Sequence, residues 1–258
     1  MPYSDDPELA NVAIEDGVLT VALAGGPAHP LSLGMIAALR RILARAAEDA
    51  AVRVIVFHGP GRIFCAGHDL KEIARHRGDS DQGLAYIKQL FADCEALMLA
   101  LTRSPKPTIA MVEGIATAGG LQLVAACDLA FAAETASFCL PGVNNGGFCT
   151  TPAVAVARNL PRKLVLEMAL SGATYDAQWA RAAGLVNRVL PANELVGCTR
   201  EFARQLATRH APAIAKGKQT LQRQLEMPLE QAYAHATEVM IGHFMDPERI
   251  ERERAEWA

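Results

Sequence analysis

The sequence has little excess charge of either sign and no long uncharged apolar run. Its 25 Lys and Arg residues stand against 28 Asp and Glu residues, which leaves a formal net charge of −3. Because no basic stripe is present, neither nucleic acid nor an anionic membrane surface is expected as a main partner. No uncharged stretch reaches the length that crosses a bilayer, so we expect no membrane-spanning segment.

Cysteine is present but lacks the spacing of a metal site or of a disulfide framework. The 6 cysteines form no CxxC pair, and most of them lie in apolar runs. We therefore expect reduced, buried thiols and no bound metal. The N-terminus is acidic and lacks a basic region followed by an apolar run, so no signal or transit peptide is expected. These features predict a cytoplasmic protein. The cysteines are Cys65, Cys94, Cys127, Cys139, Cys149 and Cys198.

Hydrophobic periodicity predicts an α/β core followed by a helical tail. Apolar residues make up 51% of the chain, which is enough to bury a large core. Alternation around Asp16-Gly17 predicts a hairpin over residues 12–23. Strands then alternate with helices over residues 1–195, and only helix is expected over residues 196–258. Further strands are expected at 52–57, 108–112, 129–132, 137–140 and 185–190, helices at 33–50, 89–101, 160–170 and 176–183, and a loop at 141–152.

The stretch from Lys106 to Asp128 organises the rest of the chain. It reads as a buried strand, a turn and a helix that begins near the pair Gly119-Gly120. Small residues at this helix N-terminus would leave N–H groups, and the positive end of the helix dipole, facing a ligand. Tight packing of the helix is an equally good explanation of the two glycines on this stretch alone.

A second loop, Ala66-Gly67-His68, also offers backbone N–H groups beside small residues, where a strand joins a helix. If this loop and the Gly119 loop meet, two N–H donors would point at one oxygen and form an oxyanion hole. Loss of one such donor costs about 10²–10³ in rate where it has been measured. Their convergence in space is the structural test of this hypothesis.

Three ordered motifs carry a resemblance to a known family. They are the run from Phe64 to Leu70, the run from Lys106 to Gly120, and Ala126-Cys-Asp128. This order resembles the enoyl-CoA hydratase/isomerase (crotonase) superfamily. Segments near Leu170 and Ala183 continue the resemblance, which covers roughly residues 12–195. The glycine-rich loop from Pro141 to Pro152 is similar to the branch called enoyl-CoA hydratase domain-containing protein 3.

The resemblance implies a fold, a ligand and an assembly. The expected fold is a crotonase-type spiral of ββα units with a C-terminal helical region at the subunit contacts. The expected ligand is an acyl-CoA thioester, with coenzyme A as part of the substrate and no separate cofactor. The implied oxyanion donors are the backbone N–H groups of His68 and Gly119. A homotrimer, or a dimer of trimers, is the implied assembly.

Two departures from the family pattern concern catalysis. Hydratases of the family carry two glutamates that position and activate water, and those positions are Gln122 and Gly142 here. The amide of glutamine does not exchange a proton near neutral pH, and glycine has no side chain that could do so. General acid–base catalysis contributes about 10²–10⁴-fold, so ordinary hydration of a 2-enoyl-CoA should be largely lost. Putting glutamate back at both positions should confer some hydration if the pocket geometry is retained.

The remaining candidates are expected to line the ligand site. His68 acts either as a backbone donor only or through its imidazole as well. Asp69 is expected mainly to cap the following helix. Cys149 as a nucleophile would need a paired histidine that the sequence does not indicate. The substrate-binding candidates are Ala66, Asp69, Leu70, Thr117, Gly120, Pro141, Asn144, Phe148, Cys149, His29 and Leu31, the last two beside the expected path of the pantetheine arm.

Two functions of different classes remain open from the sequence. The first is an acyl-CoA-transforming enzyme that has kept the oxyanion hole and lost the hydratase acid–base pair. Decarboxylation, isomerisation and thioester hydrolysis are the enolate-type or acyl-transfer reactions left to it. The second is a catalytically silent oligomer with an acyl-CoA-binding or regulatory role. Turnover of an acyl-CoA, or tight binding without turnover, separates the two.

Overall fold

The computed structural model describes Tyr3 and residues 6–257. The chain divides into two compact units, Met1–Thr208 and Arg209–Ala258. The second unit begins later than the expected helical region, because helix α8 (Ala192–Ala207) packs on the strands of the first unit. Arg204 of α8 also pairs with Glu15 and Asp16 at N–O distances of 3.2 and 3.0 Å. No helix of the described residues is both long enough and apolar enough to span a bilayer.

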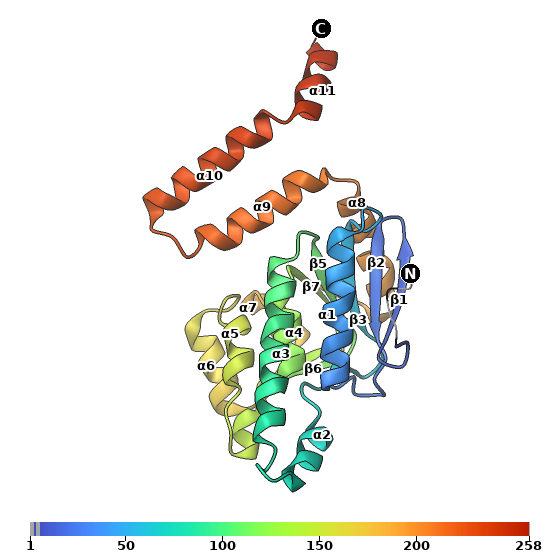
Figure 1. Cartoon of the computed structure of the whole chain (residues 1–258), viewed down its shortest axis with the longest axis vertical. Helices are drawn as coiled ribbons and strands as arrows, with labels where there is room; N and C mark the ends of the chain where they lie inside the picture. Colours follow the sequence, from blue (N-terminus) through green and yellow to red (C-terminus); the bar gives the residue numbers. More distant parts are fainter. Residues whose placement is uncertain (1–2, 4–5, 258) are drawn as a thin grey trace. The chain divides into compact units, whose positions relative to one another are not determined.

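Two sheets form the framework of the first unit (Figure 1). The six-stranded sheet has the order β1-β2-β3-β5-β7-β10, with β1 antiparallel to β2 and the other pairs parallel. The smaller sheet has the order β4-β6-β8-β9. Successive strand pairs β3–β4, β5–β6 and β7–β8 each contribute one strand to each sheet, which gives a spiral of ββ turns. The larger sheet contains β1 (Ala10–Glu15), β2 (Val18–Leu23), β3 (Val54–Gly59), β5 (Thr108–Val112), β7 (Leu129–Ala133) and β10 (Arg188–Leu190), and the smaller one β4 (Ile63–Cys65), β6 (Ile115–Thr117), β8 (Ser137–Cys139) and β9 (Thr174–Asp176).

The central strands are apolar on both faces because both faces are covered. On β3, Ile55 and Phe57 belong to one core cluster, and Val54 and Val56 belong to the other. This two-residue alternation is the pleat of a strand buried between layers. Helices α1 (Leu33–Glu48) and α3 (Leu84–Arg103) pack against each other on the first side, whereas α8 covers the second (Figure 1).

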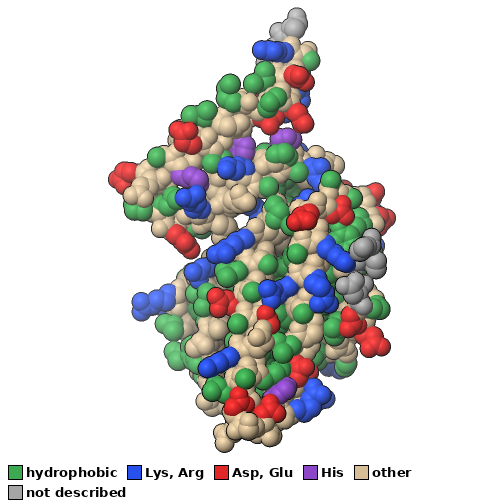
Figure 2. Space-filling view, viewed as in Figure 1, with side chains coloured by type: hydrophobic (Ala, Val, Ile, Leu, Met, Phe, Trp, Pro, Cys, Tyr) green, Lys and Arg blue, Asp and Glu red, His purple; other side chains and the backbone are tan. Residues whose placement is uncertain are grey.

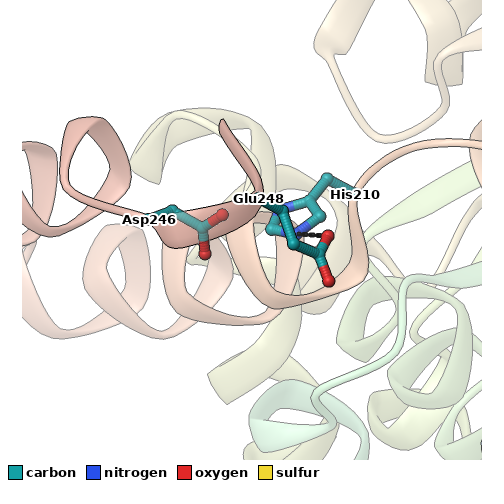
Figure 3. Close-up of side chains that lie close together, drawn as sticks. All are labelled: His210, Asp246 and Glu248. Atoms are coloured by element: carbon teal, nitrogen blue, oxygen red, sulfur yellow. Dashed lines mark ion pairs between the residues drawn. The ribbon is translucent and has the colours of Figure 1, made fainter. Parts of the chain in front are cut away.

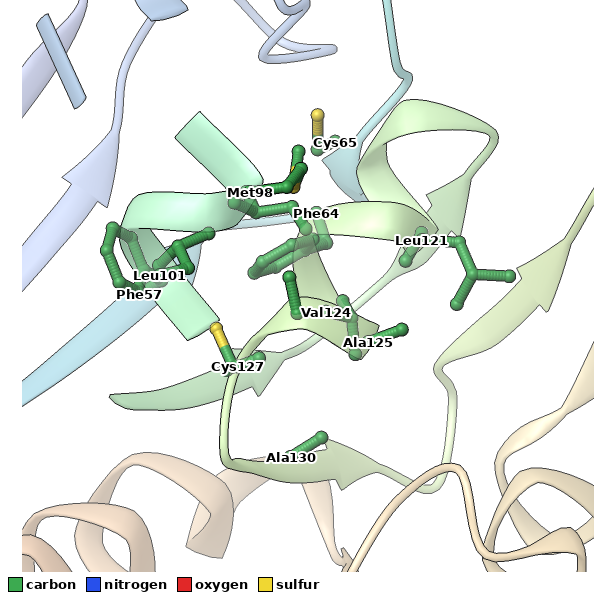
Figure 4. Packing of buried hydrophobic residues seen from close by; sticks show 14 of the residues in the cluster. Phe57, Phe64, Cys65, Met98, Leu101, Leu121, Val124, Ala125, Cys127 and Ala130 are labelled. Carbon is green, nitrogen blue, oxygen red and sulfur yellow. The ribbon is translucent and has the colours of Figure 1, made fainter. Parts of the chain in front are cut away.

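Helix α4 (Gly119–Ala126) lies inside the larger core cluster, with every residue buried. Figure 4 shows its Leu121 and Val124 near Phe64 of β4 and Met98 of α3. A helix that is buried on every side belongs to the core, so the tight packing considered for Gly119-Gly120 is present.

Most of the expected elements of the first unit are confirmed. The hairpin turns at Asp16 and Gly17 with φ angles of 51° and 78°, as a two-residue turn of this kind requires. The loop expected over 141–152 differs, since it contains a 3₁₀ helix, Pro141–Asn145, and the start of α5 (Thr150–Val156). Pro152 is tolerated there because the first turn of a helix needs no N–H donor. The other helices of this unit are α2 (Leu70–Arg75), η1 (His76–Gly78), α6 (Arg162–Ser171) and α7 (Ala177–Ala183).

The described residues of the second unit form three helices, α9 (Ala211–Gln224), α10 (Leu229–Phe244) and α11 (Pro247–Trp257). Helices α9 and α10 pack against each other. Many large apolar side chains of this unit are exposed, and Figure 2 shows hydrophobic atoms along its surface. They are Leu221, Leu225, Leu229, Tyr233, Met240, Ile241, Phe244 and Met245.

Candidate functional site

The two loops singled out in the sequence meet in the first unit. A Cβ built on Gly67 would lie 2.8 Å from the backbone nitrogen of Gly119. A Cβ built on Gly119 would lie 3.3 Å from the Cα of Gly67 and 3.7 Å from the imidazole Cε1 of His68. The loop at the end of β4 therefore touches the N-terminus of α4.

Neither the His68 amide nor the Gly119 amide donates a hydrogen bond within the described chain. Gly119 is the first residue of α4, so its N–H has no partner inside the helix. His68 forms a parallel bridge with Leu31, in which Leu31 bonds to the flanking residues. The N–H of His68 consequently faces away from Leu31. We refer to these two N–H groups as the amide pair.

Two backbone hydrogen bonds with Leu31 hold the loop that carries His68. The N–H of Leu31 donates to the Gly67 carbonyl at 2.8 Å, and the N–H of Asp69 donates to the Leu31 carbonyl at 3.4 Å. Asp69 caps α2, because its Oδ1 accepts from the N–H groups of Lys71 and Glu72 at 2.9 and 3.2 Å. The capping role expected for Asp69 is confirmed.

A further tie to this loop was not expected from the sequence. Glu72 Oε2 accepts from the Tyr86 hydroxyl at 2.7 Å and from the Leu33 N–H at 3.3 Å. Burial and the hydrogen bond to Glu72 raise the pKa of Tyr86. Glu72 therefore joins α2, α3 and the start of α1 around the Leu31–His68 bridge.

The α4 side is held by close packing and by a strained residue. A Cβ on Gly120 would lie 2.0 Å from the carbonyl oxygen of Cys65, so only glycine permits this approach. Ala118, the N-cap of α4, has φ 49° and ψ −117°, which is unfavourable for a residue with a side chain. Its N–H donates to the carbonyl of Cys139, and its carbonyl accepts from the backbone N–H of Gln122. Both contacts hold the Gly119 amide in place.

Two buried side-chain atoms at the site lack partners in the described chain. They are Nε2 of His68 and Oε1 of Gln122, and Gln122 is only 5% exposed. The imidazole of His68 lies edge-on to Phe91, with ring centroids 4.8 Å apart. Burial lowers the pKa of His68, so the ring is neutral at pH 7. Phe91 is a residue that the sequence analysis missed, because a partly exposed helical phenylalanine has no distinguishing local signal.

The segment 141–149, called the glycine loop below, closes around Gly142, the position that the resemblance assigns to the second glutamate. A Cβ on Gly142 would lie 2.7 Å from the Cys149 nitrogen and 3.1 Å from its Sγ. The Gly142 N–H donates to Cys149 Sγ at 3.2 Å. No side chain of glutamate's size fits at Gly142 while this loop keeps its conformation.

Several predicted contact residues have structural partners instead. Cys149 is buried and burial raises the pKa of its thiol, which opposes a nucleophilic role. His29 is 4% exposed, and its Nδ1 lies 3.0 and 3.1 Å from the carbonyls of Ile63 and Phe64. Asn144 donates to the Gly172 carbonyl at 3.3 Å. These three side chains bond to neighbouring loops. None of these contacts involves the amide pair.

The other predicted contact residues differ in exposure. Thr117 Oγ1 accepts from Cys139 Sγ at 3.1 Å and is partly exposed. Leu70 and Phe148 are apolar but 69% and 42% exposed. Ala66 and Pro141 are partly exposed, and Leu31 is buried with its Cδ1 3.2 Å from a Cβ built on Gly119.

One cluster of possible metal ligands lies in the second unit, formed by His210, Asp246 and Glu248 (Figure 3). Two of its members already interact, since His210 Nε2 lies 3.5 Å from Glu248 Oε2. Asp246 Oδ1 accepts from the Arg249 N–H at 3.1 Å, which is a helix cap. Ion pairing and capping account for the cluster, so we assign no metal to it.

Comparisons with known proteins identify the family of the chain. The family model described as enoyl-CoA hydratase/isomerase matches residues 13–257. The chain belongs to this family. Enoyl-CoA hydratase domain-containing protein 3 of mouse is 38% identical over 239 residues, which cover 92% of this chain and 78% of the mouse protein. The resemblance drawn from the motifs is confirmed.

Solved structures agree with this assignment. An enoyl-CoA hydratase/isomerase family protein from Silicibacter pomeroyi is 60% identical, with a TM-score of 0.89 over 93% of this chain and 100% of that chain. Human enoyl-CoA hydratase domain-containing protein 3 is 37% identical, with a TM-score of 0.90 over 96% of both chains. The expected crotonase fold is therefore confirmed.

The cytoplasmic location predicted from the sequence is contradicted by these relatives. The mouse, rat and human proteins are all named as mitochondrial. The prediction rested partly on reduced cysteines, and such cysteines are expected in any reducing compartment. They do not distinguish the cytosol from the interior of a mitochondrion.

Proposed function

We propose that this protein binds an acyl-CoA thioester and polarises its carbonyl with the backbone N–H groups of His68 and Gly119. The observation that carries the proposal is the amide pair, two unpartnered donors on loops in contact. N–H groups at a helix N-terminus have no partner inside the helix, so they are available to a ligand acceptor. Membership of an enoyl-CoA hydratase/isomerase family supports a thioester oxygen as that acceptor.

The same site supports enolate-type or acyl-transfer chemistry over addition of water to a carbon–carbon double bond. The first glutamate position is Gln122, and the second is Gly142, where the glycine loop leaves no room for a carboxylate. A carbonyl held by two donors accumulates negative charge without needing a nearby acid. Decarboxylation, isomerisation and thioester hydrolysis are the reactions that this chemistry admits, and coenzyme A enters only as part of the substrate.

The absence of an acid–base pair also favours a second candidate, a catalytically silent acyl-CoA-binding oligomer. Such a protein would retain the amide pair for affinity alone. The test is an assay of crotonyl-CoA beside malonyl-type and other acyl-CoA substrates. We expect turnover of one of the other esters and little hydration of crotonyl-CoA, whereas tight binding with no turnover of any ester selects the silent oligomer.

Replacement of Gly119 by valine tests the amide pair. The new side chain would meet Leu31 and the Gly67 backbone, so it should displace the thioester oxygen. Turnover should fall by about 10²–10³, the usual effect of losing an oxyanion donor. Gly78→Ala is the control, because a Cβ there meets nothing within 4 Å and φ is not positive. Equal turnover by Gly119→Val and wild type would reject the proposal, and ordinary crotonyl-CoA hydration by wild type would reject our interpretation of Gln122 and Gly142.

We further propose a homotrimer, or a dimer of trimers, assembled through the second unit. The exposed apolar side chains of α9 and α10 support this assembly, since contiguous apolar surface on a helix pair is typical of an interface. Light scattering on the full chain measures the assembly directly. A monomeric mass at micromolar concentration would contradict it.

A further inference from the structure

Glu72 forms its hydrogen bonds outside its own helix. It is three residues after Asp69, the N-cap of α2, and a glutamate at that position commonly bonds back to the N-cap N–H as a capping box. The N–H of Asp69 donates instead to the Leu31 carbonyl at 3.4 Å. Glu72 Oε2 accepts from the Leu33 N–H at 3.3 Å and from the Tyr86 hydroxyl at 2.7 Å. The carboxylate therefore ties α2 to other elements and does not complete the cap of α2.

The bond between Glu72 and Leu33 closes a ring of chain around the Leu31–His68 bridge. One arm of the ring runs from Leu31 to Leu33, and the other runs from His68 to Glu72. The two arms are joined at one end by the backbone bonds of the bridge and at the other end by the carboxylate. Rotation of the His68 peptide would therefore break bonds at one end of the ring.

The start of α1 shows why an acidic group suits this place. Leu33 is the first residue of α1, so its N–H has no partner inside the helix. The first turn of α1 contains no acidic residue. A carboxylate near a helix N-terminus is stabilised by the free N–H groups and by the helix dipole. Glu72 supplies from α2 the negative charge that the first turn of α1 lacks.

Tyr86 fixes the carboxylate from the core. Helix α2 fully buries none of its residues, so core packing alone does not determine its place. Tyr86 of α3, in contrast, belongs to the larger core cluster. Its ring also stacks on the imidazole of His76, with ring centroids 4.0 Å apart. The hydroxyl that donates to Glu72 thus comes from a side chain that is itself held on several sides.

Resting on the proposed function, we propose that Glu72 is a positioning residue for the amide pair, which clamps the Leu31–His68 bridge and keeps the His68 N–H directed at the thioester oxygen. Its action is indirect, because both bonds of its carboxylate go to protein groups. A displacement of about 1 Å at a reacting centre can cost about 10²-fold in rate. The clamp therefore acts on the polarisation of the carbonyl as well as on folding.

The carbonyl band of bound ¹³C-labelled butyryl-CoA tests this role. Infrared spectra are recorded with the full-length protein at saturating ligand, below the melting temperature of every variant. In Glu72→Met, which keeps the length and removes the acceptor, the shift to lower frequency seen with wild type should shrink by about half or more, because one of two donors is misaligned. Tyr86→Phe should reduce the shift less, since the bond to Leu33 remains. Glu72→Gln retains an oxygen acceptor and should keep most of the shift.

Glu95→Met is the matched control, because Glu95 is an exposed glutamate of α3. Its shift should equal that of wild type. An unchanged shift in folded Glu72→Met would overturn the positioning role even if the melting temperature fell, since Glu72 would then serve stability alone. An equal loss in Glu72→Gln and Glu72→Met would overturn it too.

If Glu72→Met does not fold, Tyr86→Phe decides, and an unchanged shift in that variant overturns the proposal. Failure of butyryl-CoA to bind wild type, or a wild-type band at its frequency in water, would instead reject the proposed function. The two failures are therefore distinguishable.

Discussion

The amide pair and the glycine loop face the same candidate site but are built in different ways. Around His68 and Gly119, backbone bonds, a strained Ala118 and a glycine contact at Gly120 hold two donors in place without satisfying them. In the glycine loop, Gly142 bonds to Cys149 and closes the space that a carboxylate would need. Under the proposed function, the amide pair would keep the carbonyl-binding half of the site, whereas Gln122 offers no carboxylate and the space around Gly142 admits none.

Gly120→Ala should lower the free energy of unfolding more than any other change, because it disturbs the packing that positions the amide pair. Its Cβ would lie 2.0 Å from the Cys65 carbonyl oxygen, a backbone atom that cannot move alone. We expect a loss of about 3 kcal/mol or more in the free energy of unfolding, as overpacking of a core produces. Urea unfolding measures it. A stability equal to that of Gly217→Ala, where a Cβ meets nothing within 4 Å, would contradict the account.

Gly142→Glu should have the next largest effect on stability. It also revises the expectation that two glutamates restore hydration. The new Cβ would lie 2.7 Å from the Cys149 nitrogen, so the glycine loop must open. We expect about 1–3 kcal/mol of destabilisation and no measurable crotonyl-CoA hydration, alone or with Gln122→Glu. Appreciable hydration by the double variant would show that the loop yields to a glutamate.

The fold could be predicted from the sequence more fully than the site. The apolar run from Val54 to Phe57 and the small-residue run before Leu121 are local patterns, and the structure has the expected strand and the expected helix start there. The space around Gly142 could not be predicted, because it depends on how Cys149 folds back over it. The contact of Gly67 with Gly119 is likewise a product of the spiral, which brings distant segments together.

Acidification should lower the free energy of unfolding by a smaller amount, through protonation of the His68 imidazole. Burial lowers the pKa of His68 below its ordinary value of 6.5, so the unfolded chain binds a proton more readily than the folded one. The stability that this group contributes is present above pH 6.5 and is lost as the pH falls below it. Comparing wild type with His68→Phe between pH 8 and pH 5 should show a shallower decline in the variant. Parallel curves would contradict the buried, neutral ring.

Ala118→Gly should change stability least, and it should raise stability where the other substitutions lower it. Glycine adopts φ 49° and ψ −117° without a Cβ clash, so the strain is relieved. Relief of about 1–3 kcal/mol of strain is partly offset by about 0.5–1 kcal/mol of extra backbone entropy in the unfolded chain. A rise in the melting temperature is expected, and a fall would show that Ala118 is not strained.

The carbonyl stretching frequency of a bound acyl-CoA tests the amide pair most directly. Isotope-edited infrared spectroscopy with a ¹³C-labelled thioester isolates this band in the complex. We predict a shift to lower frequency on binding to wild type, because two N–H donors weaken the carbonyl bond, and loss of that shift in Gly119→Val. A bound thioester whose carbonyl absorbs at its frequency in water would contradict the central claim.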